Sequence, residues 1–468
     1  MGIDIGTTAV KAVVADAEGN VLARARVPHR LMSPAPDQLE HDAARAWRRG
    51  PVRALAEVGG TAEGVAGVCV TSMVPSLTVV DARGIPRAPG LLYGDARGHE
   101  APPAGGAARS ATDAAMPDAV GFVRWAVRQA PGARGYWPAQ AVANYAIGGV
   151  PALDTGAGLC MGSLRKGAGW DPDMLASVGV RESQLPVVVN MGEVAGKVKG
   201  SGAALCGGTV DALCDQIVSG ADEAGDVLVI CGATLIVWAV VDEWFEAPGL
   251  WTLPHTTPGK VLIGGPSNAG ALFVDWARAL VRGRGHTAST RRAPGPGASG
   301  ASGMGDAGEP ARPGDPERVP VWTPYIRGER SPYHDRSLRA GLHGLDITHD
   351  AEAVERAAYE ASGFVVRHLV EIAGLTPRRI VASGGGTKVV PWMQAIADAS
   401  GLPVDTVGVS EGAALGAAYM ARWTAGLESS LDGARRWARP GYHVEPDPRW
   451  QAAASARYRT FLAHSPPD

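Results

Sequence analysis

The sequence predicts an α/β protein with two domains of duplicated topology, each a mixed β-sheet flanked by helices, around an active-site cleft. The first observation is length, because 468 residues exceed what one hydrophobic core usually organises. The second is a succession of strand, small-residue turn and strand at the start of the chain. The third is the recurrence of that pattern in the second half. We place the two domains at residues 1–222 and 223–468.

The first domain opens with an antiparallel meander. β-Branched residues flank a Gly-Thr-Thr turn, which predicts strands at 3–5 and 9–16, and a third strand at 21–25 follows a second turn. A helix is predicted over 43–58, because Asp42 can accept first-turn N–H groups and Gly59-Gly60 can end the helix. A buried strand at 65–70 completes the order β-β-β-α-β.

The second domain repeats this beginning. Residues 226–242 predict two strands around the turn 232–234, and a strand at 379–382 runs into a glycine-rich loop and a helix over 391–400. Residues 101–115 are small and polar. Residues 284–318 are rich in Gly, Pro, Ser and Ala, which predicts a disordered surface insertion without chemistry.

Composition favours a small-molecule ligand. The net charge of -3, from 44 basic and 47 acidic residues, gives no reason to expect a nucleic acid or a membrane as partner. Five scattered cysteines without a C-x-x-C pair predict buried reduced thiols. The longest uncharged run, 227–241, is too short to span a bilayer. We therefore expect a cytoplasmic protein.

The Gly-Thr-Thr turn is a candidate phosphate site. A turn without large side chains lets backbone N–H groups and two hydroxyls approach phosphate oxygens, and the adjacent Asp4 can hold hydrated Mg²⁺. An ordinary hairpin whose Asp and Thr side chains satisfy the turn is the alternative. No G-x-x-x-x-G-K-[ST] run is present, so a P-loop is not the phosphate site.

Asp211 is the candidate general base. It lies where Gly207-Gly208 run into an expected helix, and its carboxylate can take the proton of a substrate hydroxyl that attacks phosphorus. A helix cap is the alternative role, and the local sequence favours it. The loop 383–387 can complete a nucleotide site together with the Gly-Thr-Thr turn.

A series of short motifs follows one order along the chain. They are Gly2-Ile3-Asp4-Ile5-Gly6-Thr7-Thr8 with Lys11, Gly207–Ala212, Gly232-Ala233-Thr234, Pro324–Tyr333, Ser383–Asp398 and Glu411–Ala418. This ordered set resembles the FGGY carbohydrate kinases, within the sugar kinase, Hsp70 and actin superfamily. The resemblance implies two ribonuclease H-like domains. The last motif is expected to be a structural helix of small residues.

The resemblance also implies a function and its residues. ATP-dependent transfer of the γ-phosphoryl group to a sugar or polyol hydroxyl is expected, with Asp211 as base and Mg²⁺ near Asp4 and Asp211. The implied ATP-binding residues are Gly6, Thr7, Thr8, Lys11, Gly232, Ala233, Thr234, Gly384, Gly385, Gly386 and Thr387.

Acceptor recognition is expected around a Leu91–Arg97 segment that resembles the family's W-D-R stretch, with Tyr93 in place of Trp. Asp95 would bond sugar hydroxyls and Arg97 would orient it, whereas an exposed ion pair in a turn is the alternative. Ser72 and Met73 stand where xylulose kinases often have Ser-Gln-Met-His. The best expectation is a ketopentose such as D-xylulose.

Several alternatives stay open. The acceptor can be another sugar or a polyol, and the chain can be a sugar-binding regulator without catalysis or a nucleotide-driven conformational protein like Hsp70 or actin. Association into a homodimer is also compatible with the sequence. Only Met1 and Gly2 precede Ile3, whereas related chains carry several more apolar residues there. We therefore expect that the native start lies upstream.

Overall fold

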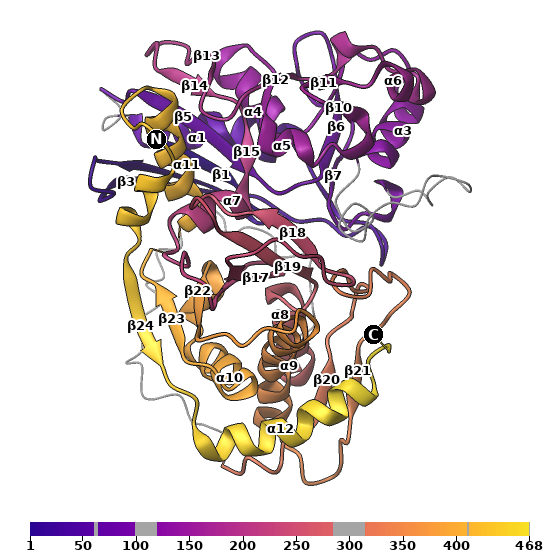
Figure 1. Cartoon of the computed structure of the whole chain (residues 1–468). Helices are drawn as coiled ribbons and strands as arrows, with labels where there is room; N and C mark the ends of the chain where they lie inside the picture. The colour runs from indigo at the N-terminus through magenta and orange to yellow at the C-terminus, as the bar shows by residue number, and fades with distance from the viewer. Residues whose placement is uncertain (60–63, 99–118, 284–313, 410, 468) are drawn as a thin grey trace, which may run out of the picture.

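Two seven-stranded sheets organise the chain (Figure 1). The computed structural model describes residues 1–59, 64–98, 119–283, 314–409 and 411–467. The first sheet has the order β13-β14-β5-β1-β2-β3, with β15 beside β5, and the second has the order β18-β19-β17-β16-β22-β23-β24. The first sheet is formed by β1 (Gly2–Ile5), β2 (Ala9–Ala15), β3 (Val21–Pro28), β5 (Gly67–Ser72), β13 (Val194–Lys197), β14 (Ala204–Cys206) and β15 (Thr209–Val210). The second is formed by β16 (Asp226–Cys231), β17 (Leu235–Val241), β18 (Trp251–Pro254), β19 (Val261–Ser267), β22 (Arg379–Ser383), β23 (Val404–Val407) and β24 (Pro440–Val444).

The two sheets share one topology. In each, an antiparallel three-stranded unit comes first, β1-β2-β3 or β16-β17-β19, and β18 adds to the outer edge of the second. The first strand of the unit then pairs in parallel with a strand that comes after one or more helices: β1 with β5 after α1, and β16 with β22 after α8 and α9. A further parallel strand and an antiparallel edge strand follow in both, β14 and β13 in one and β23 and β24 in the other. The predicted α/β fold with two domains of duplicated topology is confirmed.

Smaller sheets and helices cover these two layers. A four-stranded sheet has the order β4-β7-β6-β8. It consists of β4 (Glu40–His41), β7 (Gly90–Leu92), β6 (Ser76–Val80) and β8 (Gly135–Trp137); two-stranded pairs are β9 (Ala152–Asp154) with β12 (Val187–Val189), β10 (Arg165–Lys166) with β11 (Gly169–Trp170), and β20 (Val321–Thr323) with β21 (Gly341–His343). The helices are α1 (Gly50–Glu57), α3 (Val120–Gln129), α4 (Ala139–Gly148), α5 (Thr155–Leu159), α6 (Pro172–Val178), α7 (Asp211–Ile217), α8 (Ala271–Val281), α9 (Ala351–Ile372), α10 (Val390–Ser400), α11 (Gly412–Thr424) and α12 (Pro448–Ala463).

Most predicted elements are present, with shifted ends. The predicted helix 43–58 begins as a π-helix at Ala44–Arg49 and continues as α1, and Asp42 accepts the N–H of Arg45 at 2.9 Å as a cap. The strand predicted at 65–70 lies at 67–72, because its register is set by pairing with β1 rather than by its own apolar residues. The helix after the glycine-rich loop ends, as predicted, at Gly401 with φ 74°.

Three other expectations have mixed outcomes. All five cysteines are free and buried, as predicted. The segment 101–115 and most of the insertion 284–318 lie outside the described residues. The last five residues of that insertion are described, and Pro316 is buried with its carbonyl accepting from Arg457 Nη1 at 2.5 Å, so the predicted disorder is wrong for 314–318. Among the described residues, no helix is long and apolar enough to cross a membrane.

Helix α11 packs on the first sheet, although in sequence it lies between β23 and β24 of the second sheet (Figure 1). It lies against β1, β5 and α7, and its small residues share a buried cluster with Val13 and Cys69. A Cβ at Gly2 would lie 1.9 Å from the carbonyl oxygen of Ala414, and one at Gly416 would lie 1.9 Å from that of Cys214. The domain boundary after residue 222 remains a prediction, and a segment beyond it contributes to the first layer.

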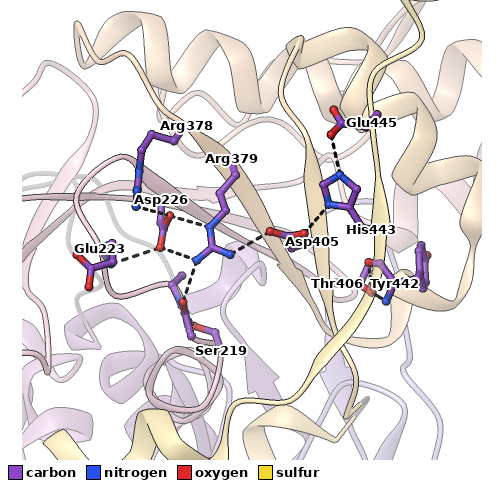
Figure 2. A network of polar contacts seen from close by, with 12 residues as sticks. Ser219, Glu223, Asp226, Arg378, Arg379, Asp405, Thr406, Tyr442, His443 and Glu445 are labelled. Atoms are coloured by element: carbon purple, nitrogen blue, oxygen red, sulfur yellow. Dashed lines mark hydrogen bonds and ion pairs between the residues drawn. The ribbon is translucent and has the colours of Figure 1, made fainter.

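An ion network joins the starts of the parallel strands in the second sheet (Figure 2). Arg379 at the start of β22 donates to both carboxylate oxygens of buried Asp226 on β16, at 2.9 and 3.0 Å, and to Asp405 on β23 at 3.0 Å. Asp405 in turn bonds His443 Nδ1 at 2.6 Å on β24, and His443 Nε2 lies 2.9 Å from Glu445. One chain of charges therefore crosses four adjacent strands.

We predict that Gly416→Ala destabilises the protein, although alanine is preferred to glycine inside helices by about 1 kcal/mol. The added Cβ meets backbone of α7, which cannot move aside as a side chain can, and overpacking of this kind costs about 1–3 kcal/mol. Urea unfolding measures the loss. Gly158→Ala in α5 is the control, because its nearest neighbour would be 3.4 Å away. Equal midpoints for the two variants would show that α11 does not approach α7 so closely.

We also predict a pH-dependent contribution from His443. Both ring nitrogens face carboxylates, Asp405 and Glu445, which raise the pKa of the imidazole above its ordinary value of 6.5. Because the folded protein favours the protonated ring, its contribution is present below pH 6.5 and is lost as the pH rises through the folded-state pKa. Urea midpoints of the wild type and His443→Gln should differ most near pH 5.5 and converge in alkaline buffer. A difference that does not change with pH would contradict this charge assignment.

Candidate active site

The acidic site begins at the carboxyl ends of parallel strands. Asp4 on β1 pairs with Thr71 on β5, which pairs with Thr209 on β15, so the three strands end at one edge of the sheet. Helix α7 starts directly after β15, and its first residue is Asp211. Ligands of open α/β sheets bind at this edge, so the fold brings Asp4 and Asp211 to the expected place.

Asp4 is buried, with 4% of its surface exposed. Burial raises the pKa of its carboxyl, and the ammonium of Lys11, with Nζ at 3.6 Å from Oδ2, opposes that rise. The charges of Asp4 first, and then of Asp215 and Glu411, raise the pKa of Lys11. The Asp4 carboxylate can therefore bind a cation, and the Lys11 ammonium beside it can bind an anion.

Asp211 has the electrostatics of a proton acceptor. Burial and the nearby charge of Asp4 raise the pKa of its carboxyl to about 6, whereas Arg330 lowers it. Its Oδ1 also accepts the N–H of Ala212 at 2.8 Å, so the carboxylate contributes to the helix start as the alternative supposed, although Val210 occupies the cap position. A base with a pKa near 6 is ionised at neutral pH and can take a proton from a hydroxyl.

Asp215 is a third acidic residue here that the sequence did not single out. It lies one helical turn after Asp211, its Oδ1 is buried without a hydrogen-bond partner, and burial followed by the charge of Asp4 raises its pKa to about 8. The described residues contain no group of three or more His, Cys, Asp or Glu side chains that could hold a metal. A magnesium ion here would rely on one or two carboxylates plus phosphate and water, its usual arrangement.

The two small-residue turns present free backbone donors. Within the described residues, the N–H groups of Thr7, Thr8, Ala233 and Thr234 have no hydrogen-bond acceptor. The carbonyl oxygens of Gly232 and Ala233 accept N–H groups from the start of α8, at 3.0 Å each, which turns the carbonyls away. Free N–H groups on such turns are suited to phosphate oxygens.

The turns are similar but not identical. Four residues separate the paired Ile5 and Val10, whereas three separate the paired Cys231 and Leu235. In both turns the glycine N–H bonds back to a carbonyl oxygen, that of Ala9 at 3.0 Å in one and that of Thr234 at 3.1 Å in the other. The sequence match between the turns therefore reflects equivalent positions in the duplicated sheets.

A buried His–Trp pair supports the first turn, and the sequence analysis missed it. Trp47 Nε1 donates to His41 Nδ1 at 3.0 Å, so the ring proton lies on Nε2, which donates to the carbonyl oxygen of Thr7 at 2.8 Å. Burial, and then the charge of His29, lowers the pKa of His41 to about 3, which keeps the ring neutral. Because its carbonyl oxygen is held by His41, the peptide that follows Thr7 has a fixed orientation. In the sequence this pair appears only as a His and a Trp six positions apart, and burial, which the sequence does not show, makes them partners.

The glycine-rich loop leaves one face open. Gly384 has φ 87° and, like Gly386, approaches Cys231 so closely that a Cβ would lie within 3.0 Å of its backbone or side chain. A Cβ on Gly385 would meet nothing within 4 Å. Thr387 Oγ1 bonds back to the carbonyl oxygen of Gly384 at 2.8 Å, and its own carbonyl accepts from the hydroxyl of Tyr442. The open face at Gly385 fits the approach of a flat or anionic ligand.

The acceptor segment differs from expectation. Asp95 is fully buried, and its two oxygens already accept from Leu39 N at 2.8 Å and from Arg97 N, Nε and Nη2 at 2.9, 3.0 and 2.7 Å. The alternative of an exposed ion pair is therefore wrong. The carboxylate of Asp95 is saturated by these four bonds. Asp95 therefore fixes the position of Arg97, which also bonds Glu40, whereas the sequence had suggested that Arg97 orients Asp95.

Ser72 and Met73 are buried beside this site. Ser72 pairs with Val210 next to Asp211, and its hydroxyl donates to the carbonyl oxygen of Met73 at 3.3 Å. The amide of Gln140 ties the strands together by donating to the carbonyl oxygens of Ser72 and Thr209, at 3.3 and 3.0 Å. Both side chains are therefore buried next to the strand that leads to Asp211, and their contact with a substrate remains a prediction.

Comparison with known proteins agrees with this geometry. The model of the FGGY family of carbohydrate kinases, N-terminal domain, matches residues 1–101, and that of the C-terminal domain matches residues 227–425. The chain is 24% identical over 473 residues to a xylulose kinase of Escherichia coli (strain K12), covering 92% of this chain and 91% of the relative. It is 26% identical over 502 residues to a glycerol kinase of Methylobacterium radiotolerans, covering 98% of this chain and 95% of that relative. A crystal structure of gluconate kinase from Lactobacillus acidophilus matches with a TM-score of 0.75 at 20% identity. The match covers 99% of this chain and 96% of the gluconate kinase.

We predict that Trp47→Phe weakens both the fold and nucleotide binding. It leaves His41 Nδ1 buried without a donor, which costs about 1–3 kcal/mol, and frees the carbonyl of Thr7. Urea unfolding and calorimetric titration with ADP measure the two effects. Trp137→Phe is the matched control, because the buried Nε1 of Trp137 has no hydrogen-bond partner among the described residues. If both variants lost the same stability and ADP affinity, the effect would come from the smaller ring volume and not from the hydrogen bond to His41.

Proposed function

The chain belongs to the FGGY family of carbohydrate kinases and is a phosphotransferase with an alcohol group as acceptor; we propose that it transfers the γ-phosphoryl group of ATP to a ketopentose such as D-xylulose. The observation that carries the reaction is the position of Asp211. It is half-buried, its carboxyl has a pKa of about 6, and the charges of Asp4 and Arg330 both act on it. The side chain of Arg330 covers the ring of Tyr93 in the acceptor segment, with Cζ 5.1 Å from the ring centre.

In the proposed reaction Asp211 takes the proton of the acceptor hydroxyl as its oxygen attacks phosphorus. The residues fit ATP. The four free N–H groups on the turns can donate to its phosphate oxygens, and the open face of Gly385 leaves room for its adenine ring. They also fit Mg²⁺, which Asp4 and Asp211 would hold and which would neutralise phosphate charge when bound. Lys11 and Thr7 are proposed to bind phosphate, and Gly384 to Thr387 the nucleoside end.

The choice of D-xylulose rests on relatives named xylulose kinase, one of them the Escherichia coli protein. Relatives named glycerol kinase and gluconokinase match at similar identity, so another sugar or a polyol is the alternative acceptor. A regulator that binds sugar without catalysis is a further alternative, and the ionised carboxylate expected at Asp211 argues against it. A cytoplasmic location and a homodimer belong to the same proposal.

We predict that an ATP-consumption screen over ketopentoses, aldopentoses and polyols finds a ketopentose as the best acceptor. Asp211→Asn should then lower the stimulated rate by roughly 10²- to 10⁴-fold, or about 3–5 kcal/mol, because the amide cannot take the proton. Asp350→Asn is the control: Asp350 caps α9 by accepting from Ala353 N at 2.8 Å, and Asn caps helices equally well.

The outcomes separate the alternatives. A best acceptor among polyols would replace D-xylulose and keep the kinase. Sugar binding without phosphoryl transfer at saturating Mg-ATP would favour the regulator. If Asp211→Asn retained full sugar-stimulated turnover, its role as base would be lost.

A further inference from the structure

Two arginines of the second domain reach the acceptor segment of the first. Arg327 Nη2 donates to the carbonyl oxygen of Gly94 at 3.1 Å, and Arg330 lies over Tyr93. Each guanidinium has five N–H donors, yet the Nε atoms of both residues are buried and find no acceptor in the described part of the chain. The side-chain bond of Arg330 is a long one, from Nη2 to the carbonyl oxygen of Ser267 at 3.3 Å. Most donors in this pair therefore have no acceptor among the described residues.

The backbone that carries them is held firmly. Buried Glu329 accepts from the Ser267 hydroxyl at 2.7 Å and from the N–H groups of Asn268 and Arg330 at 2.8 and 2.6 Å. Gly328 has φ 71°, and its Cα is so close to Arg336 that a Cβ would lie 2.4 Å from the Cα of Arg336. Donors on such a support need no reorganisation when charge develops nearby.

No carboxylate pairs with either guanidinium in the part of the chain that the structure describes. The nearest acidic groups are engaged elsewhere: Asp95 is saturated by Arg97, and the Glu329 carboxylate is occupied by its three donors. Burial lowers the pKa of Arg330, and the like charge of Arg327 lowers it further. The charges of Glu329 and Asp211 act on Arg330 without forming an ion pair with it. Half-buried cations side by side without a directly bonded carboxylate are costly, so the pair is suited to an anion that arrives with a ligand.

The position of Arg330 indicates which anion. On the second domain it contacts Ser267, which pairs with Leu235 directly after the turn 232–234. On the first domain it faces Tyr93 and is close enough to Asp211 for their charges to interact. Arg330 therefore lies between one phosphate turn and the expected general base, where a phosphoryl group would pass from nucleotide to acceptor.

We propose that Arg330, with Arg327 beside it, neutralises the phosphoryl group during its transfer. The proposal rests on the proposed kinase reaction: the bond from the acceptor oxygen to phosphorus forms, the bond from phosphorus to the β-phosphate oxygen breaks, ADP leaves, and the hydroxyl proton goes to Asp211. The guanidinium fork donates to phosphoryl oxygens that carry charge in the transition state, and it forms no covalent bond. Arg330 is thus a catalytic residue, supplied by the domain that holds the nucleotide.

The test compares binding of Mg-ADP with binding of Mg-ADP plus fluoroaluminate, a mimic of the phosphoryl group in transit, by calorimetry with and without D-xylulose. Arg330→Met should change the affinity for Mg-ADP less than about threefold and weaken the fluoroaluminate complex by roughly 10²- to 10³-fold, the usual effect of losing one such donor. Where turnover is measurable, kcat should fall by the same factor with little change in KM. Arg330→Lys keeps the charge and the packed stem, so an intermediate loss is expected.

Arg339→Met is the matched control. This arginine lies on the same loop, is exposed and pairs with Asp37 at 3.4 Å, so the variant should bind both ligands like the wild type. Equal weakening of the two nucleotide complexes by Arg330→Met, or none of either, would overturn the proposal. So would a rise in KM confined to an acidic sugar such as gluconate, because the pair would then bind the acceptor.

Failure of the kinase proposal gives a different result. If no sugar or polyol stimulates ATP consumption in the wild type, the proposed function fails whatever Arg330 binds. If the wild type turns over but its fluoroaluminate complex does not depend on Arg330, only the role of Arg330 fails. Arg330→Lys keeps the test decisive should Arg330→Met unfold, and a urea midpoint near that of the wild type verifies its fold.

Discussion

The parallel pairing of β1 with β5, repeated by β16 with β22, is the constraint on which the rest of the structure depends. It makes neighbouring strands end at the same edge, so the turn after β1 and the helix after β15 place Asp4 and Asp211 together. The repeat presents a second turn and the glycine-rich loop in the same relation. Two copies of one topology thus place free backbone N–H donors on both domains while acidic residues gather on the first.

Close packing by small residues joins the two halves of the chain. Helix α11 lies in sequence between two strands of the second sheet but packs on the first, and this is possible because Gly2, Gly67 and Gly416 have no Cβ where backbones approach each other. The motif of small residues at 411–418 thus has a steric explanation. It also means that the first layer is complete only when a late segment of the chain has returned to it.

The charges of the site form two groups with different neighbours. Asp4, Asp211 and Asp215 lie together with Lys11 as the adjacent cation, and burial raises the pKa of each of these carboxyls. Arg327 and Arg330, from the other domain, have no carboxylate partner among the described residues. The negative charge of the three carboxylates is suited to a metal ion, and the positive charge of the two arginines is suited to an anion. The metal–nucleotide substrate of a phosphotransferase would neutralise both groups.

Local chemistry was readable from the sequence because turns, caps and apolar alternation depend on neighbouring residues. The meander, the two turns, the glycine-rich loop and the position of Asp211 at a helix start were all predicted in this way. Tertiary structure decided what depends on residues distant in sequence. Four contacts join segments that no local pattern relates: the hydrogen bond of His41 to Thr7, the four bonds accepted by Asp95, the packing of α11 on the first sheet and the position of Arg330 over Tyr93. Register, burial and the approach of backbones determine those contacts, and they exist only in the folded chain.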